Sequence, residues 1–288
     1  MSRARLARQL PFASLCLTAF ASTLLAYVPG QETAAEPAPS EAEQQRMLEA
    51  ARQYADDYIA RLPDFVCQQT TFQFQAGRNG KHWHKDDTLT LKLVFNGGRE
   101  ERTLELVNNK HVRYNGPHVR MPLSTEGEFG LLLNKIFDPV SQAKFSWAGW
   151  ESIKGLRLAK FDYSIDLAHS TLSLTSYVKA TVAYHGSVYV NPANGSVWRA
   201  TSSSTEIPEE LQTKSIATTV DYDQVKIADQ SYLLPVSATV LLVTDQDQIR
   251  NELQFEGYRK FEAESTISFG PESGDPTKPT DKAAKPQQ

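Results

Sequence analysis

Alternation between apolar and polar residues constrains this chain more than any other feature of its sequence. The clearest case is the stretch 182–199, where valine and tyrosine residues of one parity lead into an Asn-Pro-Ala-Asn-Gly turn at 191–195. A period of two is what a strand with one buried face requires, and Asn-Gly supplies the positive φ of a tight reversal. The stretch is therefore predicted to be a β-hairpin within a long antiparallel sheet.

The same alternation begins at Phe65 and recurs at intervals of roughly 8 to 15 residues as far as Phe269. Val66, Phe72 and Phe74 share one parity, which predicts an apolar face on the first strand. Strand and helix signals do not alternate, so a parallel α/β fold is not expected. The pattern indicates a large antiparallel sheet, a sandwich or a barrel.

Two segments have helical periodicity instead. The first, 40–62, begins with a Ser-x-x-Glu capping box, carries apolar residues at helical intervals and ends before Pro63. The second, 125–137, has Thr-x-x-Glu spacing from Thr125 and ends before Pro139. Both helices are predicted to cover the sheet. A membrane-surface position is the alternative for the first helix, but its polar face carries more acidic than basic residues.

The chain is predicted to hold one folded domain between two extended ends. Residues 1–30 combine early arginines with an uncharged run rich in Leu, Ala and Phe, which indicates an export signal peptide, with an uncleaved N-terminal anchor as the alternative. The Pro-rich and Glu-rich residues 31–39 are expected to be a flexible linker. Residues 271–288, rich in Pro and Lys, are expected to be a disordered tail. The domain itself is expected to span 40–270.

Charge and cysteine content limit the class of protein. The net charge of −4 and the absence of a Lys/Arg cluster exclude nucleic acid as an expected partner. Of the two cysteines, Cys16 falls in the predicted signal peptide and lacks the small residue expected just before a lipid-modified cysteine. Only Cys67 remains in the mature chain, so no internal disulfide is expected.

Local motifs for metal binding are weak. His82 and His84 project to the same side of a strand and could meet on a metal ion, but no third ligand has suitable spacing. The stretch from Asp245 to Glu256 has the length of a calcium loop, yet a ligand position and the turn glycine are replaced by Ile and Arg. An exposed strand start and a polar loop are expected at these two places.

Nucleophilic catalysis has no sequence support either. The chain has no G-x-S-x-G elbow, and Cys67 is expected to be a small buried hydrophobic residue. The pair Asp86-Asp87 is expected in a solvated turn, and the glycosylation sequon at Asn194 is explained by its turn. No catalytic, cofactor-binding or metal-ligating residue is therefore predicted, and no cofactor.

The hairpin at 184–199 resembles the strand-turn-strand of periplasmic outer-membrane lipoprotein-sorting proteins of the LolA/LolB-like group. In that group the turn usually carries Asp-Pro-x-x-Gly, and here Asn191 replaces the Asp. The strings Tyr-Leu-Leu-Pro at 232–235 and Tyr-Arg-Lys-Phe at 258–261 look like the closing strands of such proteins. Together with Leu-Pro-Asp-Phe-Val-Cys at 62–67, these strings are similar to a set of uncharacterised secreted bacterial proteins.

This resemblance implies a mainly β (α+β) fold. The sheet would be large, antiparallel and curved, a half-barrel covered by an N-terminal helix and a short inserted helix, with a concave apolar face that accepts acyl chains. No functional residue is carried over by position, because the family's ligand contact is a diffuse apolar surface.

The leading hypothesis is an exported, non-enzymatic module, periplasmic or extracellular, that binds a lipid, a lipoprotein or another hydrophobic ligand in the concave face. The alternative is a structural or protein-interaction protein of the cell envelope, which has an envelope protein as its partner and no ligand cavity. A secreted hydrolase or metal-dependent enzyme is a less favoured third hypothesis. Membrane contact is expected only through the N-terminus, if that segment stays uncleaved.

Overall fold

The computed structural model describes residues 37–112, 128–175 and 178–261. It divides the chain into two compact units, Met1–Pro37 and Ala38–Gln288, and all that follows concerns the second unit. Within the described ranges, the helices are too short or too polar to cross a membrane.

The predicted ends of the chain fall largely outside this part. The predicted signal peptide at 1–30 and the predicted tail at 271–288 lie beyond the described residues. Of the predicted linker at 31–39, residues 37–39 are described, and they form neither helix nor strand. The extent of the domain, 40–270, stays a prediction.

The first helix, α1 (Glu41–Arg61), begins where the sequence predicts it. The Ser40 side chain accepts a hydrogen bond from the Glu43 amide, and the Glu43 carboxylate accepts one from the Ser40 amide at 2.9 Å. This capping box satisfies two amide groups that would otherwise lack partners at the start of the helix. One side of α1 is buried, and its members are Met47, Leu48, Ala51, Ala55 and Tyr58.

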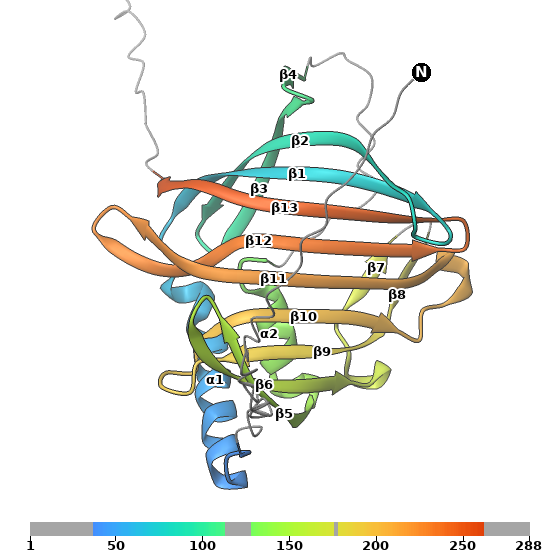
Figure 1. The fold of residues 1–288 in the computed structure, drawn as a ribbon. Helices are drawn as coiled ribbons and strands as arrows, with labels where there is room; N and C mark the ends of the chain where they lie inside the picture. Colours follow the sequence, from blue (N-terminus) through green and yellow to red (C-terminus); the bar gives the residue numbers. More distant parts are fainter. Residues whose placement is uncertain (1–36, 113–127, 176–177, 262–288) are drawn as a thin grey trace, which may run out of the picture. The chain divides into compact units, whose positions relative to one another are not determined.

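Eleven strands form one antiparallel sheet, in the spatial order β4-β3-β2-β1-β13-β12-β11-β10-β9-β6-β5 (Figure 1). Among the described residues β4 and β5 are its two edges, so the sheet is open. It bends around α1 and the short helix α2 (Leu131–Phe137), and the face toward these helices is called the concave face below. The strands are β1 (Phe65–Gly77), β2 (Trp83–Asn96), β3 (Arg99–Val107), β4 (Lys110–His111), β5 (Lys144–Ile153), β6 (Leu156–Ile165), β9 (Ala183–Val190), β10 (Val197–Thr205), β11 (Thr213–Ile227), β12 (Gln230–Thr244) and β13 (Asp247–Lys260).

The remaining elements are short. Strands β7 (Ser173–Thr175) and β8 (Lys179–Thr181) pair with each other in a separate small sheet. Three 3-10 turns are present in the described ranges: Pro139–Ser141, Leu167–His169 and Glu209–Leu211. The predicted fold class, a large curved antiparallel sheet covered by helices, is confirmed.

The predicted hairpin is formed by β9 and β10. In its turn, the Asn191 side chain accepts a hydrogen bond from the Ala193 amide, and Gly195 has a φ of +72°. A Cβ atom on Gly195 would lie 2.3 Å from the carbonyl carbon of Ala50 in α1. The turn therefore needs glycine for two reasons, the positive φ and close packing against the helix.

The predicted apolar face of β1 is wrong. Phe72 and Phe74 lie on the outer face and are only half-buried, whereas the concave side is formed by Phe65, Cys67, Gln69, Thr71 and Gln73. On the outer face Lys85 lies 4.7 Å from the Phe72 ring centroid, and Arg250 lies 4.9 Å from that of Phe74. Cation–π contacts favour these rings at a partly exposed surface, so their alternation does not mark the core.

The second helix is shorter than predicted. Residues 125–127 lie outside the described part, and α2 (Leu131–Phe137) begins only after Gly130. Gly130 has a φ of +112°, and a Cβ atom there would meet Tyr58 at 2.7 Å. A helix cannot continue through this backbone conformation, and packing against α1 requires it. Glu128, the predicted capping residue, instead binds Arg102.

The docking of α1 on the hairpin turn can be tested with glycine variants. Gly195→Ala should lower the free energy of unfolding by about 2–4 kcal/mol, because it adds a left-handed strain of about 1–2 kcal/mol to a clash with Ala50. Gly97→Ala is the matched control: its φ is +56°, and nothing lies within 4 Å of the added Cβ atom. It should lose only about 1–2 kcal/mol. Equal losses in urea denaturation would contradict the docked position of α1.

Candidate functional site

Aromatic side chains close one end of the concave face. Phe129, in the turn before α2, has its ring centroid 5.3 Å from that of Phe255 and 5.4 Å from that of Phe65. Phe95 stacks on Phe65 at 5.1 Å, and Tyr258 lies 5.4 Å from the same ring. Ring pairs of this kind contribute about 0.5–1.5 kcal/mol each beyond their buried area. This aromatic plug, made of the five residues named, ties β1, β2 and β13 to the segment that leads into α2.

Two buried tyrosines fasten α1 and the turn before α2 to the sheet. The Tyr58 hydroxyl donates to the Leu233 carbonyl oxygen at 2.8 Å, and the Tyr222 hydroxyl donates to the Glu128 carbonyl oxygen at 3.1 Å. Their rings meet edge to face at 6.1 Å. Burial raises the pKa of both phenols well above the usual value, so both remain neutral donors at any ordinary pH.

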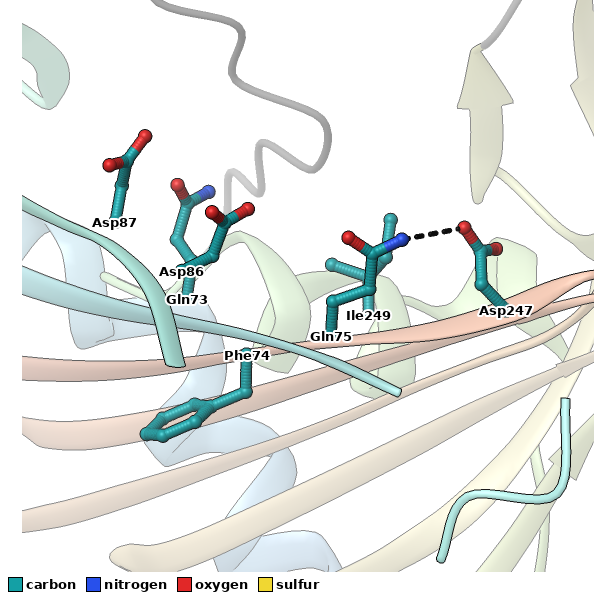
Figure 2. A pocket seen from close by; sticks show the side chains of 7 residues that line it. All are labelled: Gln73, Phe74, Gln75, Asp86, Asp87, Asp247 and Ile249. Atoms are coloured by element: carbon teal, nitrogen blue, oxygen red, sulfur yellow. Dashed lines mark hydrogen bonds between the residues drawn. The ribbon is translucent and has the colours of Figure 1, made fainter. Parts of the chain in front are cut away.

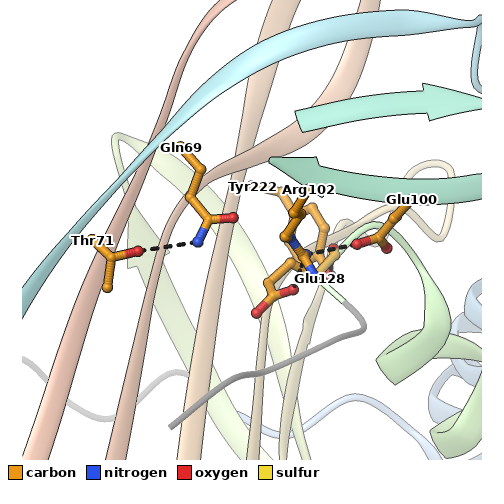
Figure 3. Close-up of polar contacts among 6 residues, drawn as sticks. All are labelled: Gln69, Thr71, Glu100, Arg102, Glu128 and Tyr222. Carbon is orange, nitrogen blue, oxygen red and sulfur yellow. Dashed lines mark hydrogen bonds and ion pairs between the residues drawn. The ribbon is translucent and has the colours of Figure 1, made fainter. Parts of the chain in front are cut away.

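An ion-pair network lies beside this contact (Figure 3). Arg102 of β3 donates to the Glu100 carboxylate at 2.6 Å and to the Glu128 carboxylate at 2.9 Å. The side chains of Arg102 and Glu100 are 15% and 16% exposed, and that of Glu128 is 2% exposed. The network therefore joins a strand near one edge of the sheet to the turn that carries the aromatic plug.

Beyond the aromatic plug, the concave side of β1 becomes polar. Gln69, Thr71 and Gln73 are 6%, 4% and 4% exposed. The Gln69 Nε2 atom donates to the Thr71 hydroxyl at 3.0 Å (Figure 3), whereas Gln69 Oε1 and Gln73 Nε2 have no hydrogen-bond partner. A buried polar atom left without a partner costs about 1–3 kcal/mol. We call these three residues the polar row.

An apolar strip runs across the neighbouring strands at the same end. Ile249 of β13 pairs with Leu242 of β12, which pairs with Ile216 of β11. Antiparallel partners share a face, and Ile249 pairs with Gln75 of β1, two residues on from Gln73, so the strip lies on the concave face. All three side chains are half-buried. The open end of the concave face thus combines accessible hydrocarbon with buried amides.

A hollow of about 210 Å³ lies at the rim of this open end (Figure 2). A β-bulge in β2 places both Asp86 and Asp87 opposite Gln73, since Phe72 pairs with Thr88 and Phe74 with Lys85. Consecutive residues of a regular strand point to opposite faces, but here both carboxylates lie on the same side as Gln73. The sequence placed the two aspartates in a turn, and this prediction is wrong.

Asp247 of β13 adds a third carboxylate to the hollow. It accepts hydrogen bonds from Gln75 Nε2 at 3.0 Å and from the Thr244 hydroxyl at 2.6 Å. Asp87 accepts one from Asn108 Nδ2 at 2.7 Å. The hollow is therefore acidic, and Ile249 lines it next to the apolar strip.

The metal candidates from the sequence do not assemble. His82 precedes β2 and His84 lies in it, both exposed, and the described residues contain no group of three His, Cys, Asp or Glu side chains that could hold a metal ion. Asp245 lies in the turn between β12 and β13 and forms an ion pair with Lys214 at 2.5 Å. From Asp247 to Glu256 the supposed calcium loop belongs to β13.

Cys67 is buried, as predicted. It lies on the concave side of β1 near Tyr258, at 2% exposure. Burial raises the pKa of the thiol to about 12, so it is protonated at neutral pH. A protonated, buried thiol is a poor nucleophile and packs as a small hydrophobic residue.

Sequence reasoning missed the polar row, the apolar strip and the hollow. A signal for the polar row was present, because Gln69, Thr71 and Gln73 continue the parity of Phe65 and Cys67. Polar residues at every second position are usually taken for the solvent face of a strand. The strip and the hollow depend on cross-strand pairing and have no local signal.

Loss of the ion-pair network should be costly. Arg102→Met removes the guanidinium from two poorly exposed carboxylates and should lower the free energy of unfolding by about 3–5 kcal/mol. Adding Glu128→Gln removes the more buried of the two charges and should recover part of the loss. Both values come from chemical denaturation. A loss below about 1 kcal/mol for Arg102→Met would show that the network behaves as a surface ion pair.

Cys67 should resist alkylation in the folded protein. In a Cys16→Ser variant, iodoacetamide at pH 8 should leave the folded chain unmodified and label it fully in denaturant, because roughly one thiol in ten thousand is ionised at a pKa near 12. Mass spectrometry reads the outcome. Labelling of the folded protein at the rate of an exposed cysteine would contradict the burial of Cys67 and support a role for it as a nucleophile.

Comparison with known proteins gives similarities at the level of fold. No family model matches the sequence, and no curated protein matches it. Similar solved structures include a LolA superfamily protein from Nitrosomonas europaea, 10% identical over 76% of this chain and 94% of that one, with a TM-score of 0.38. A putative outer membrane lipoprotein-sorting protein domain from Vibrio parahaemolyticus is 13% identical over 75% and 92%, with a TM-score of 0.34.

A third similar structure is a DUF1329 family protein from Desulfovibrio piger, 9% identical over 78% of this chain and 94% of that one, with a TM-score of 0.36. A LolA superfamily protein and a putative lipoprotein-sorting domain are thus among the structures to which this chain is similar, in line with the resemblance stated for the sequence. At these TM-scores and identities, the similarity carries no conclusion about ligand or activity.

Proposed function

We propose that this chain is an exported, non-enzymatic module that binds a lipid, a lipoprotein or another hydrophobic ligand on the open end of its concave face. The observation that carries the proposal is the apolar strip of Ile216, Leu242 and Ile249, which is half-buried and continues the core. A hydrocarbon chain laid on this strip would remove apolar surface from water. Each Å² of apolar surface buried in this way contributes about 25 cal/mol of favourable free energy.

The arrangement of the helices supports this position for the ligand. The contacts of α1 and of the Phe129 turn lie at the plugged end, with Leu233, Tyr222 and the aromatic plug. An open sheet supported at one end leaves strand surface at the other for a ligand. Sites of this kind are concave, mostly apolar and bounded by a few polar groups.

A carrier role without catalysis fits the chemistry of the buried groups. Burial raises the pKa of Cys67, Tyr58 and Tyr222, so none of them is an activated nucleophile or base near neutral pH. His82 and His84 are exposed, and although His84 pairs with Gln75, they belong to no group of metal-ligating side chains among the described residues. The proposal therefore assigns binding, and no reaction, to this chain.

One observation favours the second candidate, a structural or interaction protein of the cell envelope. The plugged end of the concave face is filled by side chains, with Phe65, Phe129 and Phe95 each at most 2% exposed. If side chains fill the open end in the same way, a partner protein would dock on the outside of the sheet. Chemical crosslinking in the cell envelope would then recover a protein and no lipid.

A pair of leucine variants distinguishes the two candidates. Leu242 and Leu241 are neighbours in β12, both half-buried, but only Leu242 faces the strip, since Leu241 pairs with Arg250 on the outer face. Leu242→Thr should weaken binding of a fluorescent fatty acid about tenfold, because a buried leucine contributes about 1.5–3 kcal/mol. Leu241→Thr should leave the affinity within about twofold.

Thermal unfolding of both variants serves as the control for folding. Equal weakening by the two substitutions would place the ligand away from the concave face. No binding by the unsubstituted protein, together with no lipid in native mass spectra of the purified chain, would reject the carrier proposal in favour of the interaction protein.

A further inference from the structure

The acidic hollow at the open end has features that the binding of a plain hydrocarbon chain does not require. Its volume is about 210 Å³. Asp86, Asp87 and Asp247 line it, and Figure 2 shows their carboxylates on the same side of the sheet as Gln73. The space suits the polar end of a small amphiphile.

Two cationic side chains of the neighbouring strands, Lys85 and Arg250, face away from this hollow. Lys85 lies over the Phe72 ring and Arg250 over the Phe74 ring, and both rings belong to the outer face of β1. Asp247 is held by Gln75 and Thr244, which are uncharged. The carboxylates are therefore gathered without a compensating lysine or arginine in the lining. A cation from outside the chain would be attracted there.

An independent observation at the same place indicates a ligand. Gln73 is 4% exposed, lines the hollow, and its Nε2 atom has no hydrogen-bond partner. Buried donors are almost always satisfied, so an unpartnered one requires an explanation. An acceptor oxygen close to the cationic group of a ligand would satisfy Gln73 while the cation meets the aspartates.

The hollow also joins the surface proposed for hydrocarbon. Ile249 lines the hollow and is the first residue of the apolar strip, which continues through Leu242 to Ile216. A molecule with its polar end among the aspartates can therefore lay its chain across β13, β12 and β11.

We propose that the hollow binds the ammonium-bearing end of an amphiphile whose hydrocarbon chain lies on the apolar strip. The inference rests on the proposed function and adds the chemical class of the ligand. Asp86 and Asp87, brought together by the bulge in β2, accept charge-assisted hydrogen bonds from the ammonium group. Gln73 Nε2 donates to an oxygen of the same polar end.

Two synthetic ligands that differ in one group test the proposal. N-dodecanoylethylenediamine and N-dodecanoylethanolamine share the chain and the amide oxygen, but the first ends in an ammonium group and the second in a hydroxyl. The unsubstituted protein should bind the ammonium ligand about tenfold more tightly in calorimetry at low salt. In Asp86→Asn/Asp87→Asn the preference should vanish, with binding of the hydroxyl ligand unchanged.

A matched variant controls for the change in net charge. Glu41→Gln/Asp56→Asn removes two carboxylates from the exposed side of α1 and should keep the preference. Gln73→Leu should weaken both ligands by a similar factor, about threefold, because both present the same amide oxygen. Unchanged affinity for both ligands in Gln73→Leu would overturn the role of Gln73.

The outcomes separate this inference from the proposed function. Equal affinity for the two ligands, or a preference that survives Asp86→Asn/Asp87→Asn, overturns the ammonium site while the strip still binds hydrocarbon. Failure of both ligands to bind rejects the hydrocarbon surface itself, and the ammonium site with it.

Discussion

Burial of one end of the concave face is the constraint on which the rest of the structure depends. An open sheet of eleven strands has a large apolar face that water would otherwise reach, and α1 with the Phe129 turn covers part of it. Close approach is achieved with small residues: Ala51 and Ala55 of α1 are fully buried, and Gly195 and Gly130 leave no room for a Cβ atom. The helix is thereby held at one end of the sheet. The other end keeps the polar row and the apolar strip as its surface.

The two ends treat buried polar groups differently. At the plugged end, the Tyr58 and Tyr222 hydroxyls both donate to backbone carbonyl oxygens, so these polar groups strengthen the packing. At the open end, Gln69 and Gln73 are equally buried yet each has an atom without a partner. Local rules of satisfaction are commonly broken where a protein binds something else. The unpartnered amides of Gln69 and Gln73, together with the half-buried apolar strip, favour the open end as the place of function.

Prediction from sequence succeeded where neighbouring residues decide the outcome. The capping box at Ser40 and the Asn-Pro-Ala-Asn-Gly turn are local, and the structure shows both as predicted. Prediction failed where contacts between residues distant in the chain decide the local structure. The start of α2 was misplaced because Gly130 must adopt a positive φ to pack against Tyr58, a residue far away in the chain. The face of β1 was misassigned because Lys85 and Arg250 stabilise Phe72 and Phe74 on the outer side.

The sequence by itself determined a mainly antiparallel fold, its hairpins and its first helix, because a period of two, a capping box and an Asn-Gly turn act within a few residues. Only the tertiary structure decided which side of β1 faces the helices and which side chains meet at the open end. The bulge in β2 places Asp86 and Asp87 beside Gln73, and the pairing of β1 with β13 brings Asp247 to the same place. Register between strands is set by the whole sheet, so no local pattern could bring these residues together.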